Sequence, residues 1–244
     1  MTSYRDPVSS MAEVESATAR VIVTASKLSD ADLLEPSPLP RWTRGHVLTH
    51  IARNADALRN LLVWAATGVE TPMYASADAR HDDINAGAPR PVAEQVADVE
   101  ESAARFARAA IEVPEANWSA RVKLRGGLEI PAWEIFVRRL NEVEIHHVDL
   151  DAGYTPAHWP AEWVARALVD IADGLADRDE FPKLVLHGED TDRDIPVRPA
   201  ASGDAVTVNG PEPALMAWLI GRSTGDGLTV EPHGRPLPGV PKWA

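Results

Sequence analysis

The stretch from Arg138 to Leu150 carries ionisable side chains within what its apolar spacing predicts to be a buried helix. Apolar residues fall on two sides of that helix, which is typical of a helix enclosed by others. Glu142 and His146 stand four positions apart, so they share one face and lie about 40° apart around the axis. A carboxylate and an imidazole inside a bundle are costly unless a partner or a metal satisfies them. The stretch therefore predicts both a helical bundle and a site within it.

Three amphipathic segments precede this helix. They are Met11 to Leu28, Arg44 to about Thr67, and Pro91 to about Ala110. Thr43 is a suitable N-cap for the second segment, and the three prolines of Glu35 to Pro40 predict a loop before it. We expect the fourth helix to begin at Pro131 and to end near Gly153. The N-terminal part is thus predicted to be a four-helix bundle.

The pattern changes after Tyr154 to Pro160, a segment rich in proline and turn residues that predicts a linker. Helical patterns then alternate with short strand patterns. We expect helices at 160–177 and 211–221, and strands at 183–187, 194–198, 205–208 and 228–231. A small hairpin is expected around Gly126 and Gly127. The fold class is therefore α+β, with a helical domain over residues 1–153 and a small α+β domain over residues 160–244.

The composition excludes several classes of function. A net charge of -13 disfavours nucleic acid and anionic membranes as partners, so small molecules are expected instead. No apolar run is long enough to span a bilayer, and Met1 to Ser10 lacks the layout of a signal peptide, so we expect a cytoplasmic protein. The chain has no cysteine, which rules out disulfides and any protein thiol nucleophile. The oligomeric state is left open, and a monomer is compatible with the sequence.

The helix that carries Glu142 and His146 needs a third ligand to complete a metal site. His46 and His50, again four positions apart, are the two candidates on the helix that begins at Arg44. Two histidines and one carboxylate suit Zn²⁺ with an open position, and they also suit non-haem Fe(II). The competing interpretation is that these histidines are ordinary residues satisfied by hydrogen bonds.

Four blocks of sequence together resemble one family. They are R-W-T-R-G-H-V-L-T-H-I-A-R-N-A-D, E-T-P-M-Y-A-S-A-D-A-R, the pattern R-x-x-E-V-x-I-H-x-V-D-L in the fourth helix, and G-R-S-T-G-D-G near the C-terminus. The chain is similar over nearly its whole length to the mycothiol-dependent maleylpyruvate isomerases. The resemblance implies that the N-terminal domain is a DinB-like four-helix bundle, a metal-binding superfamily.

When the family's motifs are matched to this sequence, the resemblance implies that the metal ligands are His50, Glu142 and His146. It also implies that Arg222 is needed for activity. The chain departs from the family pattern at His147 and Glu144, neither of which displaces a matched ligand.

Three further residues are weaker candidates for the site. Helical spacing makes Asn54 and Asp149 candidates for contacts that support the ligands, and Arg80 could assist substrate binding.

The resemblance further implies an activity, cis-trans isomerisation of maleylpyruvate to fumarylpyruvate in gentisate breakdown. Mycothiol would be the thiol cofactor, and a divalent metal, with Zn²⁺ favoured, would activate it. Addition of a thiolate to the double bond permits rotation, and its elimination restores the alkene. Because this chain lacks cysteine, the sulfur must come from such a cofactor. The expected partners are a dicarboxylate and mycothiol.

Three alternatives stay open. A mycothiol S-transferase would keep the metal ligands without requiring a dicarboxylate, and a non-haem iron oxygenase would contain iron and consume oxygen. The third is a non-catalytic bundle whose metal is structural or absent.

Overall fold

A computed structural model describes residues 6–76, 78–233 and 235–240 of the chain. The chain divides into two compact units, residues Met1–Tyr154 and Thr155–Ala244.

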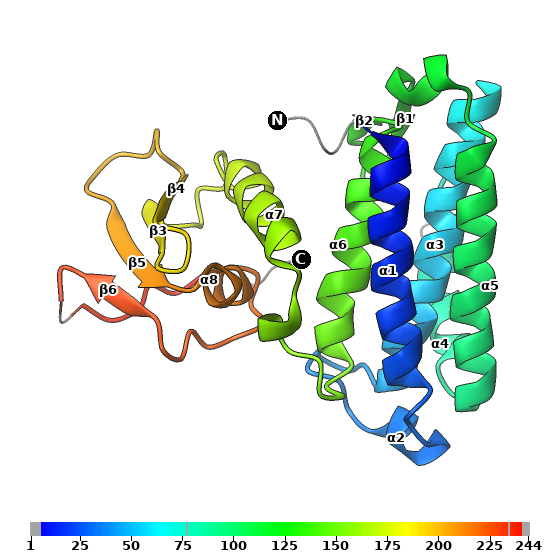
Figure 1. Ribbon diagram of the computed structural model, residues 1–244, viewed down its shortest axis with the longest axis horizontal. Helices are drawn as coiled ribbons and strands as arrows, with labels where there is room; N and C mark the ends of the chain where they lie inside the picture. The colour runs from blue at the N-terminus through cyan, green and yellow to red at the C-terminus, as the bar shows by residue number, and fades with distance from the viewer. Residues whose placement is uncertain (1–5, 77, 234, 241–244) are drawn as a thin grey trace. The chain divides into compact units, whose positions relative to one another are not determined.

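Among its described residues, the first unit has four long helices that run side by side (Figure 1). They are α1 (Pro7–Ala25), α3 (Arg44–Thr67), α5 (Val92–Ile111) and α6 (Glu134–Asp149). Helix α3 contacts both α5 and α6, and α1 covers the other side of α5 and α6. Two short helices, α2 (Asp30–Leu34) and α4 (Ala79–Gly87), lie in the connections. The predicted bundle is confirmed.

The local sequence explains the ends of α3. The Thr43 side chain accepts a hydrogen bond from the backbone N–H of His46, and the His46 ring accepts one from the backbone N–H of Thr43, which makes a reciprocal cap. At the other end, Gly68 has a φ of 73°, a left-handed conformation that glycine adopts without strain. The predicted limits of this helix agree with the structure.

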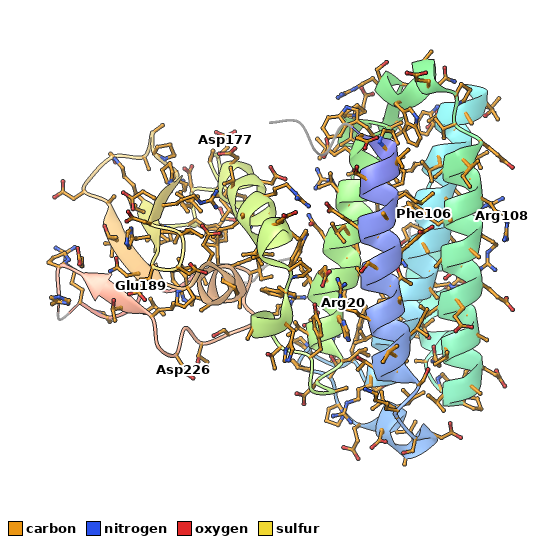
Figure 2. All side chains as sticks on the ribbon, viewed as in Figure 1. Arg20, Phe106, Arg108, Asp177, Glu189 and Asp226 are labelled. Atoms are coloured by element: carbon orange, nitrogen blue, oxygen red, sulfur yellow. The ribbon has the colours of Figure 1, made fainter. Side chains whose placement is uncertain are left out.

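The interior of the bundle is mostly apolar. Figure 2 shows Phe106 pointing into the bundle from α5, whereas Arg108, two residues later, points away from it. However, the buried face of α5 also contains Gln95 and Ser102. The Gln95 side chain accepts a hydrogen bond from Thr49 and donates one to the carbonyl oxygen of Gly87, so its amide is satisfied inside the core.

A small hairpin, β1 (Arg121–Lys123) and β2 (Glu129–Pro131), follows a 3-10 turn at Glu115–Ser119. The hairpin is at the predicted place. The predicted start of the last long helix at Pro131 is wrong, because Pro131 pairs with Arg121 in the ladder and α6 begins at Glu134.

The second unit begins with a 3-10 turn at Pro156–His158 and helix α7 (Ala161–Gly174). Its described strands form a four-stranded sheet in the order β4-β3-β5-β6. The strands are β3 (Leu184–Gly188), β4 (Arg193–Val197), β5 (Val206–Gly210) and β6 (Thr229–Glu231), and helix α8 (Glu212–Leu219) lies between β5 and β6 in the chain. Strand β3 is parallel to β5, and the other pairs are antiparallel. The predicted α+β fold class is confirmed.

Helices α7 and α8 contact each other, and α8 also packs against β3 and β5 (Figure 1). In the described part of the chain, no helix has the length and apolar character needed to cross a membrane.

Candidate metal centre

The centre of the first unit brings together three side chains from α3 and α6. His50 Nε2 lies 2.9 Å from Glu142 Oε2 and 3.0 Å from His146 Nε2, and the last two atoms are 3.4 Å apart. Ligands at about 2.1 Å from a tetrahedral Zn²⁺ would be separated by about 3.4 Å. The three atoms are therefore within about 0.5 Å of the spacing of ligands around one small cation. Within the described residues, they are the one such group of three or more metal-binding side chains.

The protonation of two of these side chains suits metal binding. Burial and the nearby His146 lower the pKa of His50 to about 4, so its ring is neutral at neutral pH. Burial acts to raise the pKa of Glu142, but hydrogen bonds from His146 and His50 outweigh it, and this pKa lies well below its ordinary value. A neutral imidazole and an ionised carboxylate are the forms that ligate a metal.

His146 is oriented by Asp149. Its Nδ1 donates a hydrogen bond to Asp149 Oδ2 at 2.8 Å, and because a carboxylate only accepts, Nε2 is the atom that can face a metal. Burial acts to lower the pKa of His146, but the hydrogen bonds to Asp149 and Glu142 outweigh it, so this pKa is raised. Asp149 is itself only 1% exposed, which fixes the geometry of the pair.

The two candidates for the third ligand are separated by the structure. His50 is buried and joins Glu142 and His146, whereas the ring of His46 is used to cap α3 at Thr43. The four-residue spacing of His46 and His50 on α3 could not distinguish them, whereas the family motif selected His50.

Arg139 is a residue that sequence analysis missed. It is 0% exposed, and its Nη1 donates to the carbonyl oxygen of Ile51 at 2.8 Å and to Asn54 Oδ1 at 3.0 Å. Burial lowers the pKa of Arg139 to about 10, and Glu142 opposes that shift. Asn54, one turn beyond His50 on α3, is therefore joined to α6 by its hydrogen bond with Arg139. The signal available in the sequence was the position of Arg139, three residues before Glu142.

Aromatic and cationic groups lie beside the cluster. The Trp42 ring is 5.4 Å from the His50 ring and 6.4 Å from the His146 ring, measured between centroids. It follows Arg41, whose φ of 68° is in the left-handed region and marks local strain in this loop. Arg80 Nη2 donates to His50 Nδ1 at 3.3 Å, and its guanidinium lies 6.0 Å from the centre of the Trp42 ring.

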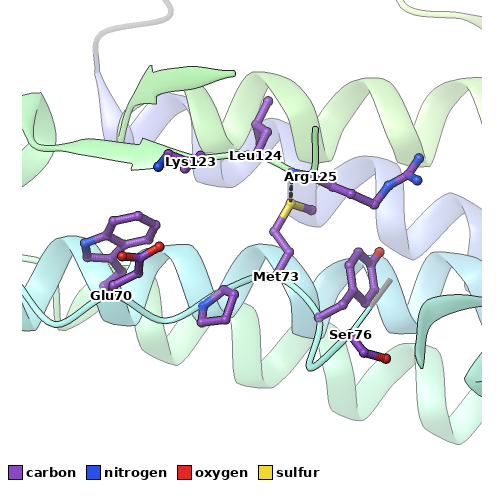
Figure 3. Close-up of a pocket in the computed structure, with 9 residues that line it drawn as sticks. Glu70, Met73, Ser76, Lys123, Leu124 and Arg125 are labelled. Atoms are coloured by element: carbon purple, nitrogen blue, oxygen red, sulfur yellow. Dashed lines mark hydrogen bonds between the residues drawn. The ribbon is translucent and has the colours of Figure 1, made fainter. Parts of the chain in front are cut away.

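Tyr74 connects this region to a pocket of about 310 Å³ (Figure 3). The pocket lies between the segment after α3 and the β1–β2 hairpin, and the Arg125 backbone N–H donates to Met73 Sδ across it at 3.2 Å. Burial raises the pKa of Tyr74, while the charge of Arg80, and a hydrogen bond with it, oppose the shift. The volume is in the range of small-ligand sites.

The residues that depart from the family pattern lie on another side of α6. The Glu144 carboxylate is bound by Arg20 on α1 and accepts a hydrogen bond from the Tyr154 hydroxyl at 2.8 Å. His147 Nε2 is 2.8 Å from Thr24 Oγ1, and the ring is stacked on Tyr154. These contacts join α6 to α1, so His147 does not compete with His146 for the cluster.

Arg222 belongs to the second unit, in the turn that follows α8. Its Nη1 donates to the carbonyl oxygen of Ile220 at 3.0 Å, and its side chain is half-buried. The predicted role of Arg222 in catalysis stays a prediction.

The fold and the donor set define a class of protein, a helical bundle with a candidate three-ligand metal site that is followed by a small α+β unit. Residues 14–151 match the model of the mycothiol maleylpyruvate isomerase N-terminal domain, and residues 158–237 match that of the MDMPI C-terminal domain. The chain belongs to the mycothiol maleylpyruvate isomerase family, and the resemblance found in the sequence is confirmed.

Two solved structures are similar to the whole chain. A crystal structure of the mycothiol-dependent maleylpyruvate isomerase is 32% identical, with a TM-score of 0.91 and full coverage of both chains. A structure of a mutant of that isomerase, in which one histidine is replaced by alanine, is 31% identical, with a TM-score of 0.90 and the same coverage. No curated protein matches the chain.

Proposed function

We propose that this protein isomerises maleylpyruvate to fumarylpyruvate with mycothiol as its thiol cofactor. The observation that carries the proposal is the convergence of His50, Glu142 and His146 in a chain that belongs to this family and has no cysteine. A thiol-dependent reaction in such a chain needs an external thiol and a group that keeps it ionised.

The donor set fits a divalent cation, and Zn²⁺ is favoured by two imidazoles and one carboxylate. His50, Glu142 and His146 would hold it. When bound, such a cation lowers the pKa of a thiol, so that a thiolate is available at neutral pH to add to the double bond and leave again after rotation.

The surrounding residues would keep these ligands in place. Asp149 holds the ring of His146, and Arg139 ties the backbone of α3 at Ile51 to α6. Trp42 covers the rings of the two histidines and would limit access of water. Arg222 would bind a carboxylate of the substrate, a role suited to the fork of a guanidinium.

The test is conversion of maleylpyruvate by purified protein in three samples: without thiol, with mycothiol, and with mycothiol after metal removal. We expect turnover only when both thiol and metal are present. Metal-loaded protein that binds mycothiol and leaves maleylpyruvate unchanged would refute the isomerase proposal and direct the search to transferase substrates.

A pair of histidine variants gives a matched control. His50→Ala should abolish turnover and metal binding while the fold is retained. His46→Ala removes the other histidine on α3, whose ring caps the helix, and should keep the metal and lose at most about 1 kcal/mol of stability. Equal metal loss in the two variants would contradict the assignment of His50.

A further inference from the structure

Arg80 is a partly buried arginine of the first unit that has no carboxylate partner among the described residues. Several other partly buried arginines of this unit form ion pairs: Arg20 with Glu144, Arg53 and Arg90 with Asp98, and Arg105 with Asp56. The contacts of Arg80 among the described residues are with the His50 ring, the Tyr74 hydroxyl and the face of Trp42. A guanidinium is thus held beside the candidate metal centre by uncharged groups.

These contacts are weak compared with what a guanidinium can make. The bond from Arg80 Nη2 to His50 Nδ1 is 3.3 Å long, near the upper limit for N–H donors. Two parallel, charge-assisted hydrogen bonds to a carboxylate are shorter and roughly twice as strong as neutral ones. A ligand carboxylate would therefore replace the contact with His50 at a net gain.

The position of Arg80 also suits an anionic ligand. The whole chain carries a net charge of -13, so a doubly charged ligand needs local positive charge, and Arg80 would add to the charge of a cation held by the cluster. The Trp42 ring provides a flat apolar surface next to the guanidinium, on which a planar, conjugated ligand can lie. The Arg80 guanidinium, the Trp42 ring and the candidate metal ligands thus lie next to one another within the first unit.

We propose that Arg80 binds a carboxylate of the dicarboxylate substrate, on the face of Trp42 and beside the His50, Glu142 and His146 cluster. This inference rests on the proposed function, which supplies the dicarboxylate. It assigns the first unit a substrate-binding arginine of its own, in addition to the proposed Arg222 of the second unit.

The test is binding of maleate, an unreactive cis-dicarboxylate in the absence of thiol, to the zinc-loaded full chain by calorimetry. Wild type is compared with Arg80→Met, which keeps an unbranched apolar stem and removes the guanidinium, and with Arg80→Lys, which keeps the positive charge. Arg121→Met is the matched control, because Arg121 is exposed and its Nη2 donates to the backbone oxygen of Glu129 at the β1–β2 hairpin, away from the cluster.

For Arg80→Met we expect the Kd for maleate to rise roughly 10- to 100-fold, the value of a hydrogen bond to a charged group. Arg80→Lys should recover part of that loss, and Arg121→Met should bind as wild type does. Zinc content should be the same in all four proteins. In the turnover assay, Arg80→Met should raise KM with a smaller change in kcat, because it removes binding that substrate and transition state share.

Three outcomes would overturn the inference: no binding of maleate by wild type, a Kd for Arg80→Met within about two-fold of wild type, or loss of zinc from Arg80→Met. The last would mean that Arg80 acts only through His50. If the dependence on Arg80 is found but maleylpyruvate is not isomerised, Arg80 binds a dicarboxylate as inferred, and the proposed function fails. If isomerisation is found without dependence on Arg80, the reverse holds.

Discussion

Asp149 offers a sharp test of whether the candidate centre is built to hold a metal. Its Oδ2 accepts the Nδ1 proton of His146 at 2.8 Å, and the residue is 1% exposed. Carboxylates in this position, behind a metal-binding histidine, fix the ring and raise its basicity, and their loss costs about 10- to 100-fold in metal affinity. Each tenfold step corresponds to about 1.4 kcal/mol.

Two substitutions separate the charge of Asp149 from its hydrogen bond. Asp149→Asn keeps an oxygen that can accept from His146 Nδ1, so only the charge is lost, and we expect about a tenfold loss of zinc affinity. Asp149→Ala removes the acceptor as well and leaves a buried N–H without its partner. Because a hydrogen bond to a charged group contributes about 1.5–3 kcal/mol, this variant should lose roughly 100-fold.

The assay is competition for Zn²⁺ with a chelator of known affinity, near pH 8 so that protons compete little for the histidines. Asp151→Asn is the control, since that side chain is 69% exposed and lies 3.8 Å from Arg44, outside the cluster. Zinc affinities of both Asp149 variants within about two-fold of wild type would refute the reasoning. In that case His146 either does not bind the metal or is oriented by something other than Asp149.

Two further predictions concern stability and can be measured by urea unfolding. A Cβ at Gly45 would lie 2.2 Å from the backbone oxygen of Ala88. Gly45→Ala should therefore lower the free energy of unfolding of the first unit by about 1–3 kcal/mol. A change below about 0.5 kcal/mol would contradict this. Tyr154→Phe keeps an aromatic ring to stack on His147 but removes the hydrogen-bond donor to Glu144, which is 1% exposed. The free energy of unfolding should therefore fall by about 1–3 kcal/mol. An unchanged unfolding midpoint would show that the hydroxyl contributes nothing.

Much of the helical unit could be predicted because its signals are local. Helix α3 is defined within one stretch of sequence by Thr43, by the apolar spacing that follows it and by Gly68. The four-residue spacing of Glu142 and His146 defines a face of α6 without knowledge of the rest of the chain. The choice of His50 over His46 needed the family motif, because both positions fit the spacing.

The residues that were missed are those whose partners come from distant segments. Arg139 is stable in the core because Ile51 and Asn54 accept its hydrogen bonds, and these residues lie more than eighty positions away in the chain. Gln95 is buried for a similar reason, with its amide bound by Thr49 and the backbone near α4. A polar residue with no visible partner in the sequence is normally placed on the surface.

The same reasoning explains why α6 can be polar on two sides. Glu142 and His146 face α3, while Glu144 binds Arg20 on α1. A helix held only by apolar contacts can shift slightly along its neighbours at little cost, whereas buried charge-assisted hydrogen bonds lose strength steeply with geometry. The bond between Arg20 and Glu144 therefore fixes the axial position of α6. Glu144 lies two residues from both Glu142 and His146, so the same bond also fixes the positions along α6 at which these two side chains meet His50. Helix α1 should therefore influence the candidate centre without contributing a ligand to it.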